Sequence, residues 1–497
     1  MKTYEPKLRA YLVKVVDRKE IASGKPASAD RYKVNPGIEL TGYLGQHGGV
    51  RISKGVREPA GAFSITMVDK PHSKLLDSLY ALIEPMDMIE FRLAHNPHDY
   101  AKPEQGYSLP IVMRGLVSSI NRGESMQNGI PMRAVTITGH DFGKILQTIQ
   151  IFYLNNSVVG DNIVSGLGFF QKYSESGAAK HMPANDFLLD AVQKVVAPYI
   201  AKMLMTTRAQ DVGATKLENF TVKANIPGVV SPFAAASFRD VSVYQMLASL
   251  LDVGPFNEMF MRDDEDGLTL VARPAPLRTA AGEWVQTDSS GQPAKADGIA
   301  ISSHDVQSIN LGRTDAGVAN YYWVENERWT LMHSADARMA AMQGEASSFI
   351  AFDYPNSNAS LYGIRKMEVF ASLGPPNYMN ADGPKEGVLA AQTNEIGGWL
   401  AERRRILADI NKDNVVFESG TIRLRGNEKI KAGHYLVLTR GVGEVVSEYY
   451  ITRVEHDFRP FIGFFTTVHV ERGTSFIERA GRPNPINFAE VDAGGVS

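Results

Sequence analysis

The chain has 497 residues, which is too long for one hydrophobic core, so about three or four domains are expected. Its content of 44% hydrophobic and 22% charged residues is that of a folded globular protein, and its net charge of -3 argues against sequence-specific binding of nucleic acid, which requires concentrated Lys and Arg. The absence of cysteine excludes disulfides, thiol catalysis and cysteine-ligated metals. No secretory signal and no membrane-spanning run are predicted, because no apolar core follows Lys2 and no apolar run approaches about 18 residues.

The first part of the chain predicts short β-strands in close succession. The runs AYLVKVVDR, GGVRISKG, GAFSITMVDK and MDMIEFRLAH alternate apolar and polar residues and are separated by Gly, Pro and Asp clusters. Such spacing is typical of a barrel or sandwich and not of a fold that alternates strands with helices. Residues 1–145 are therefore predicted to form a first tube-like β-barrel domain.

Residues 146–298 predict a mixed helical and β domain. A helix is expected over DFLLDAVQKVVAPYIAKMLM, capped by Asn185 and kinked at Pro198. A second helix is expected after Ser242 and Gln245, which fit a capping box, and it should end at Gly254-Pro255. The segment 257–274 then predicts a hairpin closed at Asp266-Gly267.

The remainder predicts a second barrel with an insertion. Residues 299–330 and 415–473 are interpreted as a second tube-like β-barrel domain, interrupted by a helix-rich insertion at 331–414. In GGWLAERRRILADINKDN the basic cluster 403–405 is expected on the solvated face of a helix, with Glu402 and Asp409 as counter-charges. Residues 474–497 lack apolar periodicity and are expected to form a C-terminal arm. The fold class predicted is thus multidomain α+β, with two antiparallel tube-like β-barrels and helix-rich intervening and inserted domains.

Two hairpin-like segments repeat the same pattern, one over Ile111–Gly143 and the other over Ser447–Gly473. Each has two runs rich in Val, Ile, Thr and aromatic residues on either side of a polar turn, which is typical of paired antiparallel strands. We expect Arg114–Ile120 to superimpose on Ile451–His456, and Val135–His140 on Thr467–Arg472. A duplicated β unit favours a ring: three copies of a chain with two similar units give six similar units, so a homotrimer is predicted.

Several motifs that suggest binding sites are better explained by structure. MRDDEDGLTLVAR imitates a calcium loop, but Arg262 and Arg273 stand where carboxylates are required, so a hairpin turn is predicted. GHDFGKI imitates a phosphate loop but lacks its spacing and has Ile145 in place of Ser or Thr. The adjacent aromatic residues 321–323 lie in a predicted strand and are expected in a core, although their exposure would favour glycan binding.

Three His-Asp dipeptides and one His-rich loop have the residue types of metal ligands. These are His140-Asp141, His304-Asp305, His456-Asp457 and the segment 95–99, HNPHD. The dipeptides follow alternating strand patterns, so they are interpreted as polar residues at strand ends. No motif of a known hydrolase, kinase or metalloprotease is present, and no carboxylate pair stands out. We therefore predict no catalytic, cofactor-binding or metal-binding residues, no cofactor and no enzymatic activity.

The order of elements resembles the baseplate hub family of contractile-tailed phages, whose relatives include the late control D proteins and the N-terminal part of secretion-system spike proteins. The matching stretches are GAFSITMVD, IVMRGLVSSI with AVTITGHDFGKIL, SVYQMLASLL, LTLVARP, LRGNEKIKAGHYLVL, EYYITRVEHDF and FFTTVHVERG. They cover most of residues 8–473, and their order carries the resemblance. The chain departs from secretion-system spikes in having no evident β-helical needle, which places a needle on a partner.

The resemblance implies a structural virion protein in the tail baseplate, assembled in the host cytoplasm. It implies a hub trimer that adapts the six-fold tail tube to the three-fold central spike and lines the channel for genome ejection. The implied partners are the spike, the tail tube, other baseplate proteins and the tape measure protein. Two alternatives stay open from the sequence: a tail-associated peptidoglycan hydrolase and a host-glycan binding module.

Overall fold

The fold is described from a computed structural model. The described residues are 5–14, 37–70, 78–100, 109–127, 130–151, 182–200, 220–230, 241–325, 358–376, 386–440 and 444–475. The predicted C-terminal arm lies outside these ranges except for Thr474 and Ser475, and residues 331–357 and 377–385 of the predicted insertion also lie outside them. No helix in the described part of the chain is long and apolar enough to cross a membrane.

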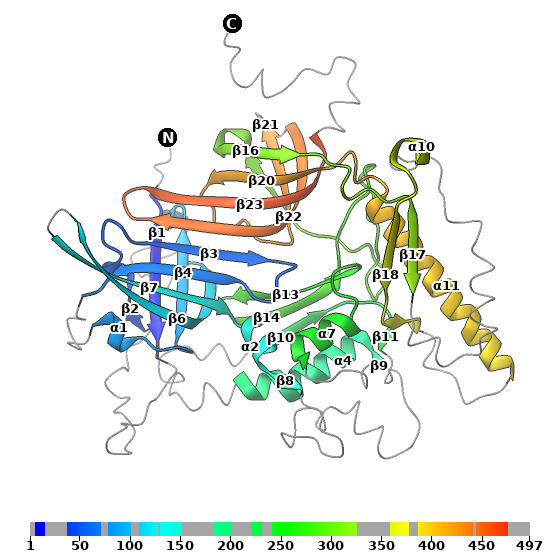
Figure 1. The fold of residues 1–497 in the computed structure, drawn as a ribbon, viewed down its shortest axis with the longest axis horizontal. Coiled ribbons are helices and arrows are strands. Elements are labelled where there is room, and N and C mark those ends of the chain that lie inside the picture. Colours follow the sequence, from blue (N-terminus) through cyan, green and yellow to red (C-terminus); the bar gives the residue numbers. More distant parts are fainter. Residues whose placement is uncertain are drawn as a thin grey trace, which may run out of the picture.

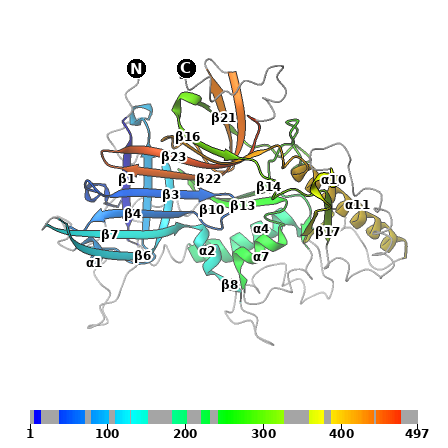
Figure 2. The ribbon, with the colours of Figure 1, turned by 45° about the horizontal axis from the view of Figure 1, so that its top comes forward.

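One large, mostly antiparallel sheet dominates the molecule, with helices below it and at one end (Figures 1 and 2). Its path runs β16-β20-β23-β22-β3-β4-β7-β6-β5-β1-β2, and β21 with β15 branches from β22. The strands of its N-terminal half are β1 (Lys7–Val13), β2 (Ile38–Glu39), β3 (Gly49–Gly55), β4 (Ala62–Val68), β5 (Met88–Ala94), β6 (Ile111–Gln127) and β7 (Ile130–Asp141). Those of its C-terminal half are β15 (Gly298–Ser302), β16 (Val306–Gly312), β20 (Glu418–Arg425), β21 (Tyr435–Arg440), β22 (Glu444–Arg459) and β23 (Gly463–Gly473).

The two halves meet along the long strand β22. Its first part pairs with β21, and its second part pairs with β3 over Arg453↔Gly55 to Phe458↔Val50. The sequence predicted two separate barrels. In the described residues the strands instead form one continuous sheet, and neither half of it closes on itself. Each half has its own apolar core, and Phe464 of the second half packs into the core of the first.

A five-stranded unit occurs twice in this sheet with the same strand order. The order β5-β6-β7-β4-β3 of the first unit corresponds to β21-β22-β23-β20-β16 of the second. The register irregularities also correspond, because the bulge between Phe91 and Arg92 matches that between Leu438 and Thr439. The bulge of β6 between Val117 and Ser119 likewise matches that of β22 between Ile451 and Arg453. Since a β-bulge has a specific place in a strand pair, the agreement indicates a true internal repeat.

The register of the repeat differs from the alignment predicted from the sequence. Leu116 pairs with His140 just before the first bulge, and Tyr450 pairs with Glu471 just before the second. Arg114–Ile120 therefore corresponds to Glu448–Val454, and Val135–His140 to Thr466–Glu471. The predicted segments lie on the corresponding strands, but their bounds differ: the first is displaced by three residues at its start and two at its end, and the second by one. Alternation fixes the faces of a strand and not its register.

Helices α2 (Gly143–Thr148), α4 (Ala184–Ala191) and α7 (Val243–Leu250) lie below the sheet and, with the hairpin of β13 (Asn257–Asp264) and β14 (Gly267–Pro274), form the largest apolar core of the described residues. The predicted hairpin is thus confirmed, with Asp264 paired to Gly267. Helix α4 (Ala184–Ala191) continues through a π-helical stretch, Val192–Val196, just before Pro198. Asn185 was predicted to cap this helix, and that prediction was wrong. Its side chain instead accepts a hydrogen bond from the backbone N–H of Ile226.

Helix α7 (Val243–Leu250) begins with the predicted capping box, in which Ser242 and Gln245 each bond the other's backbone N–H. Replacing Ser242 with alanine is expected to lower the free energy of unfolding by about 1 kcal/mol, because the N–H of Gln245 loses its partner. Chemical denaturation of the two proteins measures this difference. Ser242→Asp should restore most of the loss, and an unchanged midpoint in the alanine variant would contradict the role of the cap.

Helix α11 (Glu386–Asn411) contains the predicted basic cluster and lies beside β17 (Tyr321–Glu325) and β18 (Lys366–Phe370). Arg405 is exposed and pairs with Glu402 and Asp409, as predicted. Arg403 is not solvated, however: it is buried against the rings of Trp399 and Phe256. Helical periodicity places 403 beside the apolar stripe, and the predicted solvated face was therefore wrong at this position.

Candidate functional site

A network of buried charges lies where the β13–β14 hairpin packs against the junction of the two sheet halves. It borders a cavity of about 110 Å³, whose lining includes Lys54, Asp263, Arg273, Lys431, His434 and His456. These side chains come from β3, β13, β14, β22 and the segment before β21, and therefore from both halves of the sheet and from the hairpin. The network therefore connects the two halves of the sheet to each other and to the hairpin.

Lys54 is the central cation of the junction. Its ammonium bonds the carboxylate of Asp263 and lies 3.4 Å from Asp141 at the end of β7. Burial opposes the charged form of Lys54, but the two carboxylates outweigh it and raise the pKa of the lysine. Burial also raises the pKa of Asp141 to about 6, although Lys54 acts in the opposite direction. One cation thus holds together two buried acids from different parts of the chain.

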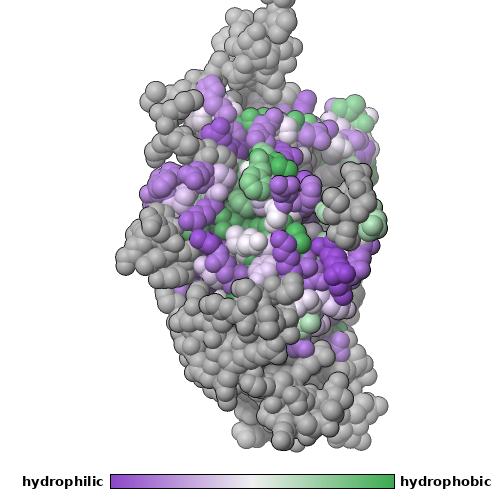
Figure 3. All heavy atoms as spheres, turned by 90° about the vertical axis from the view of Figure 1, so that its left-hand side faces the viewer, coloured by the Kyte–Doolittle hydropathy of each residue, from purple (hydrophilic) through white to green (hydrophobic). Residues whose placement is uncertain are grey.

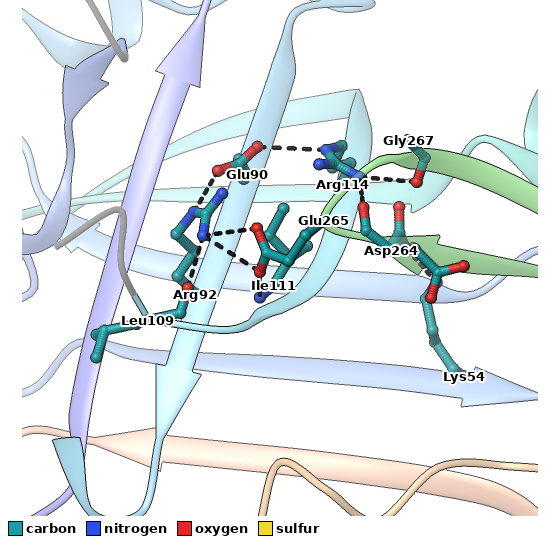
Figure 4. A network of polar contacts seen from close by, with 10 residues as sticks. Lys54, Glu90, Arg92, Leu109, Ile111, Arg114, Asp264, Glu265 and Gly267 are labelled. Atoms are coloured by element: carbon teal, nitrogen blue, oxygen red, sulfur yellow. Dashed lines mark hydrogen bonds and ion pairs between the residues drawn. The ribbon is translucent and has the colours of Figure 1, made fainter. Parts of the chain in front are cut away.

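Two arginines clamp the turn of the β13–β14 hairpin onto the N-terminal half (Figure 4). Arg114 of β6 donates to the carbonyl oxygens of Asp264 at 2.8 Å and Gly267 at 3.2 Å. Arg92 of β5 reaches the carboxylate of Glu265, which also accepts a hydrogen bond of 3.0 Å from the N–H of Ile111. The acidic turn that imitates a calcium loop is therefore bound by arginines and by backbone groups.

A second cluster ties the same hairpin to the C-terminal half. Glu258 of β13 accepts hydrogen bonds from Arg273 of β14, at 3.2 Å, and from the hydroxyl of Tyr450 in β22. Arg273 also donates to the carbonyl oxygen of Gly433 at 2.6 Å. Burial raises the pKa of Glu258 and raises that of Tyr450 well above its ordinary value. The hairpin is therefore bonded to both halves, which fixes their relative position.

His456 gives the junction a predicted response to acid. Burial lowers its pKa to about 4 from an ordinary 6.5, so the folded protein holds it neutral beside Thr466, 3.1 Å away. A group with a depressed pKa contributes stability above its unfolded pKa and loses it as the pH falls toward the folded value. We expect His456→Gln to remove this loss. Between pH 7 and pH 4, the free energy of unfolding of the variant should rise by roughly 3 kcal/mol relative to that of the unmodified chain.

The comparison is made by urea denaturation of both proteins across this pH range. Asp141, whose pKa is raised to about 6, acts with the opposite sign, since its protonation favours the folded state as the pH falls. Its contribution is shared by both proteins and cancels in the difference. Parallel pH profiles of the two proteins would contradict the assignment to His456.

The sequence motifs that suggested metals are dispersed in the structure. His140-Asp141 ends β7 as predicted, but His304-Asp305 lies in a 3-10 helix, Ser303–Asp305, and His456-Asp457 lies inside β22. His95 contacts Glu428 at 2.9 Å through Nδ1, and its Nε2 lies 3.9 Å from Asp99 of the same segment. Within the described ranges, no group of three or more His, Asp or Glu side chains is arranged to hold a metal ion.

The closed ends of the two repeated hairpins lie at one end of the molecule, on the left in Figure 1. The turn after β22 presents Phe461 and Ile462 to solvent, and the end of β6 presents Met126. Figure 3 views this end and shows apolar side chains among hydrophilic ones. Exposed apolar turns of this kind suit contact with another protein.

No protein-family model and no curated protein matches the chain. Among solved structures it is similar to a tail protein from Neisseria meningitidis MC58, with 12% identity, 94% of this chain and 97% of that chain covered, and a TM-score of 0.44. It is also similar to the prophage MuSo2 43 kDa tail protein from Shewanella oneidensis, with 12% identity, 94% and 96% covered, and a TM-score of 0.40. A prophage tail protein from Listeria monocytogenes has 8% identity, 92% and 94% covered, and a TM-score of 0.39. At these identities and TM-scores the likenesses do not by themselves assign a function.

Proposed function

We propose that the chain is a structural, non-enzymatic component of a phage tail, and more specifically the hub of a contractile-tail baseplate. In this role three copies form a ring that adapts the six-fold tail tube to the three-fold spike and surrounds the channel for genome ejection. The partners are the tail tube, the spike and neighbouring baseplate proteins, with the tape measure protein inside the channel. The location is the tail baseplate of the virion.

The internal repeat is the observation that carries the proposal. Two units with the same strand order and matching bulges lie in one sheet. A six-fold partner offers six equivalent contacts, and three chains satisfy them when each chain presents two similar surfaces. The domain boundaries predicted from the sequence belong to this proposal: first unit 1–145, second unit 299–330 with 415–473, intervening domain 146–298, insertion 331–414 and arm 474–497.

The character of the junction supports a mechanical role. Its buried cations face carboxylates and backbone carbonyls of the same chain, as Lys54, Arg114 and Arg273 do. Such a network, when its members have partners, fixes one arrangement of the parts that it joins. A subunit that transmits force between a tube and a spike requires this rigidity between its two repeated units.

Light scattering on the full-length protein, alone and mixed with tail tube and spike proteins, tests the proposal. The expected mass is that of three chains, with a stable complex formed with both partners. A chain that stays monomeric in the presence of both partners contradicts the hub assignment. The non-enzymatic role would be contradicted if the purified protein degraded peptidoglycan and if replacing one carboxylate abolished that degradation.

A further inference from the structure

Each of the two repeated units has one strand edge that is paired in the other unit but has no paired strand in its own. In the first unit the outer edge of β3 is covered by β22, from Arg453↔Gly55 to Phe458↔Val50. The corresponding strand of the second unit is β16, which pairs with β20 on one side. On its other side no strand is present in the described part of the chain. Figure 1 shows β16 at the upper margin of the sheet, far from β6.

An apolar side chain marks the uncovered edge. Val50 of β3 stands opposite Ile65, and Ile309 of β16 stands opposite Ile422 in the corresponding place. Ile65 and Ile422 are both fully buried, so Val50 and Ile309 each lie on the sheet face that carries a buried residue of the neighbouring strand. Val50 is 2% exposed, whereas Ile309 is 52% exposed. The same position is covered in the first unit and open in the second, which indicates a missing partner.

The complementary open edge lies on β6. Register matching places β6 residues 119–124 where β22 residues 453–458 pair with β3. The backbone hydrogen bonds just before this edge are the same in both units. In the first, the N–H of Met86 donates to the carbonyl oxygen of Val117, whose own N–H donates to that of Asp87. In the second, Gly433, Ile451 and His434 make the same two bonds. Beyond Val117 this side of β6 carries no strand within the described ranges. The edge that binds β3 in the second unit is therefore repeated in the first without a paired strand, although helix α1 (Leu79–Leu82) contacts β6 and the ring of Tyr80 lies against Arg122.

We propose that β16 of one copy of this chain pairs with β6 of the next copy, as an antiparallel continuation of the sheet that repeats the β3–β22 pairing within a chain. The expected register follows from the intrachain pairs. It sets Asn121 opposite Gly312, Arg122 opposite Leu311, Gly123 opposite Asn310 and Glu124 opposite Ile309 of the neighbouring copy. The inference rests on the proposed ring and names the surface that closes it.

The arrangement of the two edges favours a ring over a simple dimer. β16 is the end strand of the sheet, whereas β6 is an inner strand whose part beyond Leu116 is not paired with β5. The two edges differ from each other and lie far apart, so their contact is head-to-tail (Figures 1 and 2). A head-to-tail contact that repeats the rotation between the two units closes into a ring when the rotations complete a circle. Pairing also covers two open strand edges, which folded proteins otherwise protect against unwanted association.

Cysteine cross-linking tests the register in the full-length protein, which has no cysteine of its own. Gly123→Cys and Asn310→Cys are combined in one chain, because the two positions are predicted to face each other between copies. Both positions are exposed, and a Cβ built on Gly123 has no atom within 4 Å, so the fold tolerates the change. Mild oxidation is expected to give disulfide-linked dimers and trimers on non-reducing gels, lost on reduction.

Two matched controls accompany the experiment. Arg51→Cys with Asp457→Cys places the pair at the equivalent positions within one chain, and it should close inside the monomer without a ladder. Gly123→Cys with Ser308→Cys keeps the same strands and the same face but shifts the register by two residues, about 7 Å along the strand. Its cross-linking yield is expected to fall at least about tenfold below that of the matched pair.

The outcomes separate the interface from the function. A trimer by light scattering that gives no Gly123–Asn310 cross-link, while the intrachain control closes, overturns the interface and leaves the hub proposal standing. Equal yields from the matched and shifted pairs overturn the register. A protein that is monomeric with tail tube and spike overturns both proposals, and a ladder limited to the matched pair supports them.

Discussion

Replacing Lys54 with methionine is expected to lower the free energy of unfolding by about 3 to 5 kcal/mol, because it removes one partner of a buried ion cluster. The carboxylates of Asp141 and Asp263 would then face each other without the ammonium that lies between them. Methionine preserves the apolar stem and therefore the packing. Chemical denaturation monitored by circular dichroism measures the change.

The effect should depend on pH and should be specific to the buried position. Lowering the pH toward 4 protonates Asp141, whose pKa is already raised to about 6, and should relieve part of the loss in the variant. Arg51→Met serves as the control, since Arg51 lies on the same strand with its side chain 64% exposed beside Glu455. Its cost is expected to stay below about 1 kcal/mol. Equal losses in both variants would refute the special role of Lys54.

Replacing Gly139 with alanine is expected to cost roughly 3 kcal/mol, because there is no room for a methyl group. A Cβ at this position would lie 2.2 Å from the carbonyl oxygen of Leu116 and 2.5 Å from the ring of Phe63. The ring of Phe63 also lies over Gly115, so it occupies the space above both glycines. Thermal unfolding of the variant should show a lowered melting temperature with the same overall fold.

Two further variants sharpen this expectation. Phe63→Leu in the Gly139→Ala background should recover part of the loss, because a smaller side chain frees space beside the new methyl group. Gly123→Ala, farther along the same hairpin, is the control, since nothing lies within 4 Å of its built Cβ. A melting temperature as low for Gly123→Ala as for Gly139→Ala would show that the strand, and not the contact with Phe63, is responsible.

The contact between Phe63 and Gly139 also explains why the repeat is difficult to recognise from the sequence. By register, Phe63 and Gly139 of the first unit correspond to Gly420 and Val470 of the second. The bulky residue lies on β4 in one unit, and on the facing strand in the other. Because the larger residue and the glycine have changed places between the two strands, an alignment by residue type misses the true register.

Local features were predictable because short-range chemistry determines them. The capping box at Ser242, the β13–β14 hairpin and the two long hairpins follow from spacing and turn residues alone. The polar junction was not predicted. Lys54, Arg114 and Glu258 meet only in the folded chain, and within their strands they read as ordinary alternating polar residues. The clearest available signal was the set of charged residues within otherwise apolar strands, such as Arg114 in IVMRGLV.

A symmetry-resolved image of the assembled protein by electron cryo-microscopy tests the central claim most directly. The account predicts a closed ring of three chains in which six similar five-stranded units surround one axis, with β16 of each chain beside β6 of the next. The two units of each chain should be related by about 60° around that axis, as six equivalent units in a full circle require. A monomer, a two-fold dimer, or a ring in which the two units of a chain occupy unrelated positions would contradict it.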